Sequence, residues 1–329
     1  MSNSIYTSAL SQFAEKRVLV IGDLMLDEHV WGAVERISPE APVMVVKAEA
    51  GSDCLPGGAA NVANNIRALG GEVAMVGVVG DDEGGGILRR VLSDAGVDVG
   101  GMLTDTGRPT TRKTRVWASR RHQVVRIDRE SSDKVSHAIA GKMIDYIRSA
   151  SKDADAVLLS DYAKGVISKD IVAAALDTGK PTVSNIKPRS LTNTQNVDVI
   201  TMNLTEASAA SRIDILDLDD LKRAGRKLID QTNNKGIVIT RGAQGLSAFE
   251  KSGAITHIPA IETEVYDVAG AGDTVVSALT MALACGVELP VACMIANCAG
   301  AAVVRKVGVS TTTTDEIADL LGQAMGSIS

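Results

Sequence analysis

The chain has 329 residues, enough for two ordinary domains or one large α/β unit. Hydrophobic residues make up 45% of the sequence and charged residues 22%, which is ordinary globular usage and excludes a disordered, collagen-like or coiled-coil chain. The net charge of -6 provides no global basic field, so neither a nucleic acid nor a membrane is expected as a partner.

Cysteine and histidine spacing predicts no zinc site, because the four cysteines form no CxxC pair and the four histidines are scattered. The thiols are expected to be reduced and mostly buried. Residues 1–16 lack a long apolar core after a basic segment, and apolar stretches elsewhere are interrupted by Gly, Asn or Thr. The sequence therefore predicts a soluble, cytoplasmic protein.

Strand patterns and helix patterns alternate along the chain. Short β-branched runs beside turn residues predict buried strands at 18–21, 73–79, 156–159, 197–200 and 237–240. Apolar stripes and one apolar run predict helices within 57–70, 134–147, 218–229 and 275–285. This order implies right-handed crossovers, and hence an α/β fold with a mainly parallel sheet and helices on both faces.

Two segments, about 28–55 and about 109–129, depart from this alternation and have the pattern of antiparallel strands. Each carries one of the two tryptophans, Trp31 and Trp117. We expect the two segments to pair into a small sheet over the active face, where they form a lid.

The segment Asp267-Val-Ala-Gly-Ala-Gly-Asp-Thr274 is the strongest chemical signal. It is a glycine turn that enters an apolar helix, so the N–H groups of residues 270–273 are expected to converge at the positive end of the helix dipole and bind an anion. A carboxylate beside that anion, Asp273, is well placed to take a proton from an attacking hydroxyl. The alternative is an ordinary Asp N-cap after a glycine loop.

A second glycine-rich turn, Pro56-Gly-Gly-Ala-Ala-Asn61, lets a ligand approach the backbone, and the amide of Asn61 can hold a sugar hydroxyl. Asp23 and Asp27 follow the first strand, at the carboxyl edge of the predicted sheet, and complete a polyol pocket. The alternatives are a solvated Asn61 and aspartates that only shape a turn.

Two further polar segments follow predicted strands. In Thr201-Met-Asn203-Leu-Thr-Glu206, the Asn and Glu side chains can orient magnesium waters and phosphate oxygens. In Thr240-Arg-Gly242-Ala-Gln-Gly245, the backbone can support a nucleotide's phosphates. A helix capping box and a hairpin turn are the respective alternatives. The sequence contains no G-x-x-x-x-G-K-[ST], no G-x-G-x-x-G after a strand and no G-x-S-x-G.

With these motifs in order over nearly the whole chain, the sequence resembles the ribokinase-like (PfkB) carbohydrate kinases, and within them the kinases of D-glycero-D-manno-heptose 7-phosphate. The finer resemblance is carried by Asp23-Leu-Met-Leu-Asp27, Arg36-Ile-Ser-Pro-Glu-Ala-Pro-Val43, Pro56-Gly-Gly-Ala-Ala-Asn-Val-Ala63, Lys113-Thr-Arg-Val116, the stretch 123–126 with Asp128, and Ser160-Asp-Tyr-Ala-Lys-Gly165. It implies a three-layer fold, ATP and Mg²⁺ as cofactors, and phosphorylation of the heptose at C1 to the 1,7-bisphosphate for ADP-heptose and lipopolysaccharide core synthesis.

The resemblance also implies roles for individual residues. Asp273 is implied as the catalytic base, in the turn of Gly270, Ala271 and Gly272. The implied nucleotide contacts are Asn185, Asn203, Glu206, Thr240, Gly242, Gly245 and Asn297, with Glu206 holding the metal through water. The implied substrate contacts are Asp23, Asp27, Gly57, Gly58, Asn61, Arg115, Arg120, Arg126, Asp161, Lys164 and Lys187. A homodimer through the lid is expected by the same resemblance.

The sequence departs from the heptose kinases at two points. Asn185-Ile-Lys187-Pro188 stands where they commonly carry Asp-Pro-Lys, and Asn185 is kept as a nucleotide contact because Asn at this position faces ATP in ribokinases. Bifunctional members append a nucleotidyltransferase domain marked by His-x-Gly-His, and no histidine of this sequence begins that motif. A single kinase domain over 1–329 is therefore expected, without a C-terminal nucleotidyltransferase domain.

Composition of the predicted lid independently favours a phosphorylated substrate. Residues 112–129 hold seven Lys or Arg and one acid in a protein that is acidic overall. Because Arg binds phosphate bidentately, Arg115, Arg120 or Arg126 can close on a 7-phosphate while the other end of the sugar meets Asp273. A solvated basic face or a dimer contact is the alternative.

Three classes of function compete: a sugar-phosphate kinase, a kinase-fold binding or regulatory protein without chemistry, and a nucleoside or other small-alcohol kinase. A binding or regulatory protein without chemistry would lack the catalytic base, whereas Asp273 and Glu206 are both present. The third class would need an aromatic pocket for a nucleobase, whereas aromatic residues are only 2% of the chain. The sequence thus favours a sugar-phosphate kinase, a phosphotransferase with an alcohol acceptor.

Overall fold

A nine-stranded sheet forms the centre of the computed structural model, which describes residues 3–119 and 122–326. The strand order is β14-β13-β12-β11-β10-β9-β1-β5-β6. The parallel strands are β1 (Arg17–Gly22), β5 (Glu72–Val79), β6 (Asp98–Thr104), β9 (Ala156–Ser160), β10 (Thr182–Asn185), β11 (Val199–Asn203) and β12 (Gly236–Thr240). Two antiparallel strands, β13 (Leu246–Glu250) and β14 (Ile255–Ile258), complete one edge. The predicted mainly parallel sheet is confirmed.

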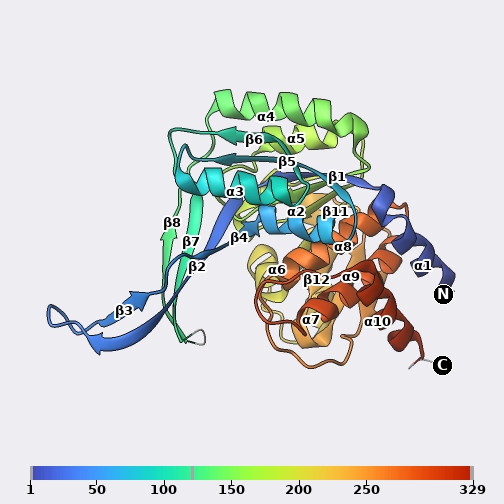
Figure 1. Cartoon of the computed structure of the whole chain (residues 1–329). Coiled ribbons are helices and arrows are strands. Elements are labelled where there is room, and N and C mark those ends of the chain that lie inside the picture. Colours follow the sequence, from blue (N-terminus) through green and yellow to red (C-terminus); the bar gives the residue numbers. More distant parts are fainter. Residues whose placement is uncertain (1–2, 120–121, 327–329) are drawn as a thin grey trace.

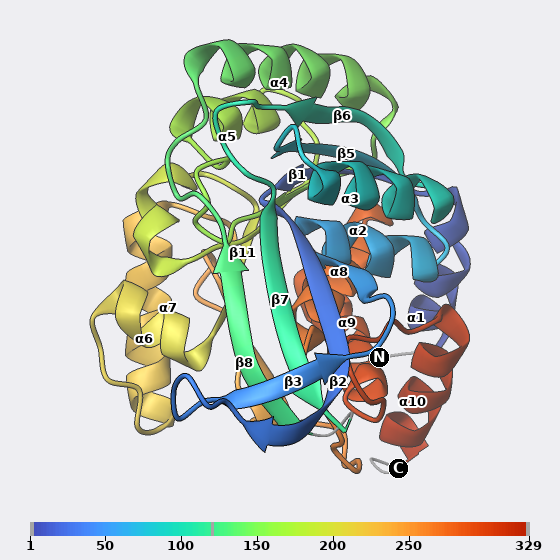
Figure 2. The ribbon, with the colours of Figure 1, turned by 60° about the vertical axis from the view of Figure 1, so that its left-hand side comes forward.

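Helices cover both faces of this sheet, as Figures 1 and 2 show. Alternate residues of β1 explain the three layers: Val18 and Val20 pack into one hydrophobic cluster, while Leu19 and Ile21 pack into the other. One face is covered by α1 (Asn3–Ser11), α2 (Ala59–Ala68), α3 (Glu83–Asp94), α8 (Ala271–Ala284), α9 (Leu289–Val303) and α10 (Thr314–Gly326). The other face is covered by α4 (His137–Ala150), α5 (Lys169–Leu176), α6 (Leu204–Ser211) and α7 (Leu218–Thr232).

A second, five-stranded sheet forms the lid and extends away from the helical body on the left of Figure 1. Its strands are β2 (Leu24–Ile37), β3 (Met44–Ala48), β4 (Asp53–Gly58), β7 (Thr111–Ala118) and β8 (His122–Arg129). β2 runs parallel to β7 and antiparallel to β3 and β4, and this pairing sets Trp31 opposite Trp117, with the ring centroids 5.5 Å apart. The predicted pairing of the two tryptophan-bearing segments is confirmed. The lid begins earlier than predicted, because β2 starts at Leu24 and includes Asp27.

The remaining sequence-based expectations concern thiols and membranes. All four cysteines are free, as predicted; Cys293 and Cys298 are buried, whereas Cys54 and Cys285 are only partly buried. Among the described residues, no helix combines the length and apolar character that crossing a bilayer requires.

Candidate active site

Two adjoining cavities lie where the carboxyl ends of β10, β11 and β12 meet the N-terminus of α8. The smaller, which we call the polar cavity, has a volume of about 180 Å³ and is lined by Tyr162, Asn185, Lys187, Thr201, Met202, Asn203, Glu206, Thr240, Gly270, Gly272, Asp273 and Val275. The larger, the apolar cavity, has a volume of about 470 Å³. Thr240, Gly272 and Val275 line both, so the two cavities meet at the glycine turn.

Asp273 lies in the first turn of α8 with only 8% of its surface exposed. The N-cap residue of this helix is Gly270, and no side chain caps the helix, which rules out the simple N-cap interpretation of Asp273. Instead the carboxylate accepts hydrogen bonds from Nδ2 of Asn61 at 2.7 Å and from the hydroxyl of Tyr162. Burial raises the pKa of Asp273, and these two donors oppose that rise because they favour the anion.

The glycine turn has the backbone that its sequence predicts. Gly270 has a φ of +78°, in the left-handed region, and a Cβ there would lie 3.2 Å from Nδ2 of Asn61. A Cβ at Gly272 would meet nothing within 4 Å, so this position leaves open space between the cavities. The N–H of Ala271 donates to the carbonyl of Val268 at 3.3 Å, so it does not converge with the others as predicted. The positive end of the helix dipole still makes the location suitable for a phosphate.

Asn61 is buried at the start of α2, next to Gly57 and Gly58. Its backbone carbonyl accepts a hydrogen bond from Nδ2 of Asn65 at 2.9 Å, and Oδ1 of Asn65 in turn accepts from the hydroxyl of Thr274 at 2.6 Å. This chain of amides ties α2 to α8. Asn61, predicted as a sugar contact, is therefore the residue that holds one oxygen of Asp273.

Asp23 and Asp161, both predicted as substrate contacts, accept hydrogen bonds from backbone N–H groups. Asp23 is 1% exposed and accepts the N–H groups of Tyr162 at 2.7 Å, Lys164 at 3.0 Å and Val166 at 3.2 Å. Burial raises the pKa of Asp23 to about 6. Asp161 accepts the N–H of Ala163 at 2.8 Å. Local sequence does not reveal that the loop 161–166 folds over both carboxylates.

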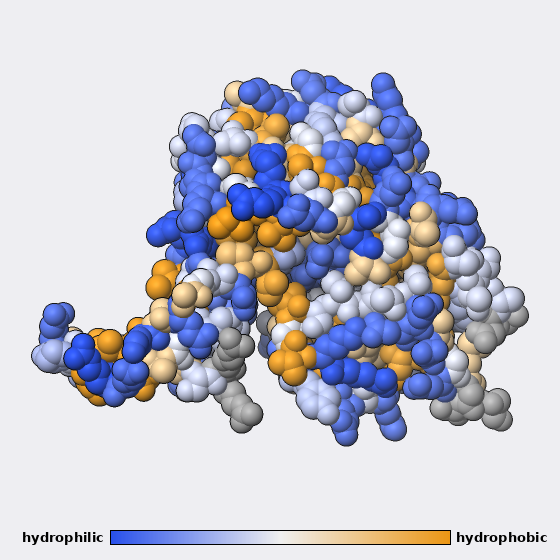
Figure 3. Space-filling model, viewed as in Figure 1, coloured by the Kyte–Doolittle hydropathy of each residue, from blue (hydrophilic) through white to orange (hydrophobic). Residues whose placement is uncertain are grey.

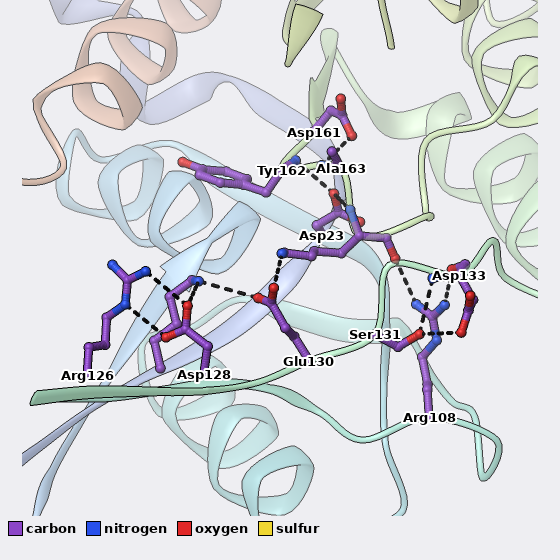
Figure 4. A network of polar contacts seen from close by, with 12 residues as sticks. Asp23, Arg108, Arg126, Asp128, Glu130, Ser131, Asp133, Asp161, Tyr162 and Ala163 are labelled. Carbon is purple, nitrogen blue, oxygen red and sulfur yellow. Dashed lines mark hydrogen bonds and ion pairs between the residues drawn. The ribbon is translucent and has the colours of Figure 1, made fainter. Parts of the chain in front are cut away.

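Tyr162 is the site residue that sequence reasoning missed. The signal was present, since this residue lies within the segment Ser160 to Gly165 that carries the family resemblance. Its hydroxyl contacts Asp273, and its ring lies 5.2 Å from Nζ of Lys187. Figure 4 shows its backbone held above Asp23, beside the ion pairs of the lid.

The wall of the polar cavity at the start of α6 contains a capping box. Oδ1 of Asn203 accepts the N–H of Glu206 at 2.8 Å, and Oε2 of Glu206 accepts the N–H of Asn203 at 3.0 Å. Oε1 of Glu206 pairs with Nζ of Lys187 at 2.6 Å. The predicted capping alternative is thus present, and the same residues still line the cavity together with Asn185.

These residues fit a magnesium ion only through water. In residues 3–119 and 122–326 no group of three His, Cys, Asp or Glu side chains is arranged to hold a metal. Glu206 has one oxygen in the capping box and one on Lys187. A single carboxylate beside a phosphate site is a usual arrangement for Mg²⁺, which keeps several waters.

The apolar cavity is bounded by the turn between β12 and β13 and by α8 and α9. Gly242 and Gly245 have positive φ and lie in the turn that joins the antiparallel strands β12 and β13, as the hairpin alternative predicted. The same turn lines the apolar cavity. Asn297 lies at the cavity wall, where its Nδ2 donates to the carbonyl of Pro259 at 2.9 Å.

Several basic side chains of the lid pair with carboxylates within the described structure. Arg115 pairs with Asp27 of β2, and Arg126 pairs with Asp128 at 2.9 Å. Besides Asp128, the partner acids come from β2 and from Glu130, the residue after β8, which pairs with Lys113 at 3.4 Å and with Lys164 at 2.6 Å. Figure 4 shows Arg126, Asp128 and Glu130 close to Asp23 and Tyr162. Arg120 lies outside the described residues.

The lid and the helical body leave a recess between them, visible in Figure 3. A recess under a β lid, a buried carboxylate at a helix N-terminus and an adjoining apolar cavity define a small-molecule phosphotransferase. The chain belongs to the pfkB family of carbohydrate kinases, whose model matches residues 15–316.

The chain is 44% identical over 319 residues to bifunctional protein HldE of Geobacter metallireducens, covering 95% of this chain and 65% of that protein. It is 42% identical over 321 residues to bifunctional protein HldE of Geotalea uraniireducens, covering 96% of this chain and 65% of that protein. The chain thus spans about 65% of the length of these curated relatives.

Solved structures with the same fold include phosphofructokinase-2 from Escherichia coli in complex with potassium, with a TM-score of 0.78 at 18% identity over 94% of this chain and 99% of that one. Ribokinase from Arabidopsis thaliana complexed with ribose and ATP has a TM-score of 0.72 at 20% identity over 93% of this chain and 98% of that one. These similarities show the ribokinase-like fold.

Proposed function

We propose that the chain transfers the γ-phosphoryl group of ATP to C1 of D-glycero-D-manno-heptose 7-phosphate, giving the 1,7-bisphosphate for ADP-heptose and lipopolysaccharide core synthesis. The observation that carries this proposal is Asp273, a buried carboxylate at the N-terminus of α8 that two side-chain donors hold in place. The heptose-kinase motifs and the HldE relatives support the choice of sugar.

In this proposal the nucleotide's base lies in the apolar cavity and its phosphates reach the N-terminus of α8 past Gly272. The C1 hydroxyl gives its proton to Asp273 while its oxygen bonds to the γ-phosphorus. The bond from that phosphorus to the β–γ bridging oxygen breaks, and ADP leaves. Mg²⁺, held through water by Glu206, supplies charge neutralisation on the phosphates.

The 7-phosphate is proposed to bind on the lid side, opposite the nucleotide. Arg115 and Lys164 each pair with a carboxylate, so the phosphate either uses their remaining N–H donors or replaces Asp27 or Glu130 as the acceptor. A phosphate dianion carries more charge and more acceptor oxygens than a carboxylate, which favours this exchange when the lid closes.

The acceptor specificity tests the proposal. Turnover with ATP is measured for heptose 7-phosphate, fructose 6-phosphate, ribose and adenosine under one set of conditions. The expected result is the highest kcat/KM for heptose 7-phosphate, with the bisphosphate and ADP formed in equal amounts. A higher kcat/KM for an unphosphorylated acceptor would contradict a sugar-phosphate kinase.

We also propose that two copies associate through their lids. The lid exposes apolar side chains: Ile37 is 60% exposed, Val43 56%, Met44 47% and Ile127 55%. Apolar side chains near the lid's end are visible in Figure 3. Sedimentation should show a dimer for the unaltered chain and a monomer for Met44→Asp, and a monomeric unaltered chain would contradict this association.

A further inference from the structure

Tyr162 lies against three other residues of the site: Asp273, Asp23 and Lys187. Its hydroxyl donates to Oδ1 of Asp273, and its backbone N–H donates to Oδ2 of Asp23 at 2.7 Å. Its ring lies 5.2 Å from Nζ of Lys187, which pairs with Glu206 on the nucleotide side. The buried Asp23 thus fixes the backbone from which the phenol reaches the base.

The carboxylate of Asp273 has one side-chain donor on each oxygen among the residues that the structure describes. Tyr162 donates to Oδ1 and Asn61 donates to Oδ2. A base must be ionised before it can accept a proton, and burial opposes ionisation. Each donor therefore contributes to the fraction of Asp273 that is competent at neutral pH.

We propose that Tyr162 is a positioning residue for the base: its hydroxyl keeps the carboxylate of Asp273 ionised and oriented, and it shares Oδ1 with the sugar's hydroxyl when the acceptor binds. A carboxylate oxygen can accept two hydrogen bonds, so the acceptor need not expel the phenol. This inference rests on the proposed function, because it takes Asp273 as the proton acceptor.

The groups that face Asp273 come from four segments. Tyr162 follows β9, Lys187 follows β10, Asn61 begins α2 and Asp27 belongs to β2. Lys187 lowers the pKa of Asp273 and Asp27 raises it, but in the described residues the side-chain donors to the carboxylate are Tyr162 and Asn61. Removing the hydroxyl of Tyr162 leaves these other groups in place, so the change isolates a single donor.

Tyr162→Phe is the decisive variant, because it keeps the ring beneath Lys187 and removes only the hydroxyl. The acid limb of the pH profile of kcat should move up by about one pH unit, since the anion of Asp273 loses one charge-assisted hydrogen bond. The kcat should fall about tenfold at the acid end and recover toward the unaltered value at high pH, where Asp273 is ionised in both proteins. The KM for ATP should not change.

Tyr146→Phe is the matched control. Its hydroxyl donates to Oδ2 of Asp98 at 3.2 Å, on the far side of the sheet from the site, so its loss should leave the pH profile in place. A second control is Tyr162→Phe in an Asp273→Asn background, where the removed hydroxyl should cost no further activity in single-turnover measurements.

Two results would overturn the proposal: an acid limb that stays in place in Tyr162→Phe, or the same loss in both backgrounds, which would mean that Tyr162 acts on the substrate independently of Asp273. An unaltered chain that phosphorylates none of the tested sugars, or an Asp273→Asn variant with full turnover, would contradict the proposed function itself.

Discussion

Asn61 and Asp273 lie 212 positions apart in the chain, yet the amide nitrogen of one is 2.7 Å from a carboxylate oxygen of the other. The contact joins the two glycine-rich turns of the sequence, one entering α2 and the other entering α8. It brings a side chain from the N-terminal half of the molecule to the proposed base, which lies in the C-terminal half.

Asp273→Asn should lower kcat by about 10²- to 10⁴-fold, because the amide cannot accept the acceptor's proton while the N–H groups of the helix turn stay in place. Affinity for ATP, measured by calorimetry without acceptor, should be nearly unchanged. Turnover close to that of the unaltered chain would show that Asp273 is not the base.

Gly270→Ala should destabilise the protein by about 1–3 kcal/mol, because its φ of +78° strains any side chain and a Cβ there lies 3.1 Å from Cγ1 of Val309. Gly272→Ala is the matched control, since its Cβ would meet nothing within 4 Å. It should unfold at the unaltered temperature yet slow phosphoryl transfer, because it fills the space between the cavities. Equal unfolding midpoints for the two variants would contradict this account.

Arg115→Ala should raise KM for the sugar phosphate by about 10- to 100-fold and leave KM for ATP unchanged, as expected for the loss of a charge-assisted hydrogen bond to phosphate. Arg112→Ala serves as the control: Arg112 pairs with Glu28 and Glu83, and its position three residues away puts it on the opposite face of β7. If the basic segment only balances the carboxylates of the lid, Arg115→Ala and Arg112→Ala should have the same KM for the sugar phosphate. Lys164→Ala would then be the next variant to assay.

Asp23 should make stability fall as the pH rises from about 4 to about 6. Its folded pKa of about 6 exceeds the ordinary value of 3.8, so in this window the folded state binds more protons than the unfolded state. The stability that the Asp23 carboxyl contributes is fully present below its unfolded pKa and is lost as the pH passes its folded pKa. In Asp23→Asn this part of the pH dependence should be absent from denaturant unfolding curves, and an identical slope in both proteins would contradict the assignment.

Local sequence predicted much of the fold. β-Branched runs marked β1, β5 and β12 to within one or two residues at each end, because the signal for a buried strand lies in the strand itself. It did not mark α9, since that helix is buried on most sides and no amphipathic stripe distinguishes it. Nor did it mark α3, which begins Glu-Gly-Gly-Gly; a Cβ at Gly85 would lie 2.6 Å from the carbonyl oxygen of Gly80, so packing requires glycine there against helix propensity.

The sequence alone determined the family, the glycine turn that carries Asp273 and the two segments of the lid, because each is a contiguous pattern of residues. Only the tertiary structure decided what each side chain contacts. It turned Asp23 toward the backbone of a loop 139 residues away, paired Arg115 with Asp27, and brought Tyr162 to the base. The physical reason is that periodicity and turn chemistry act within a few residues, whereas a buried polar group must find its partner from whichever distant segment the packing brings beside it.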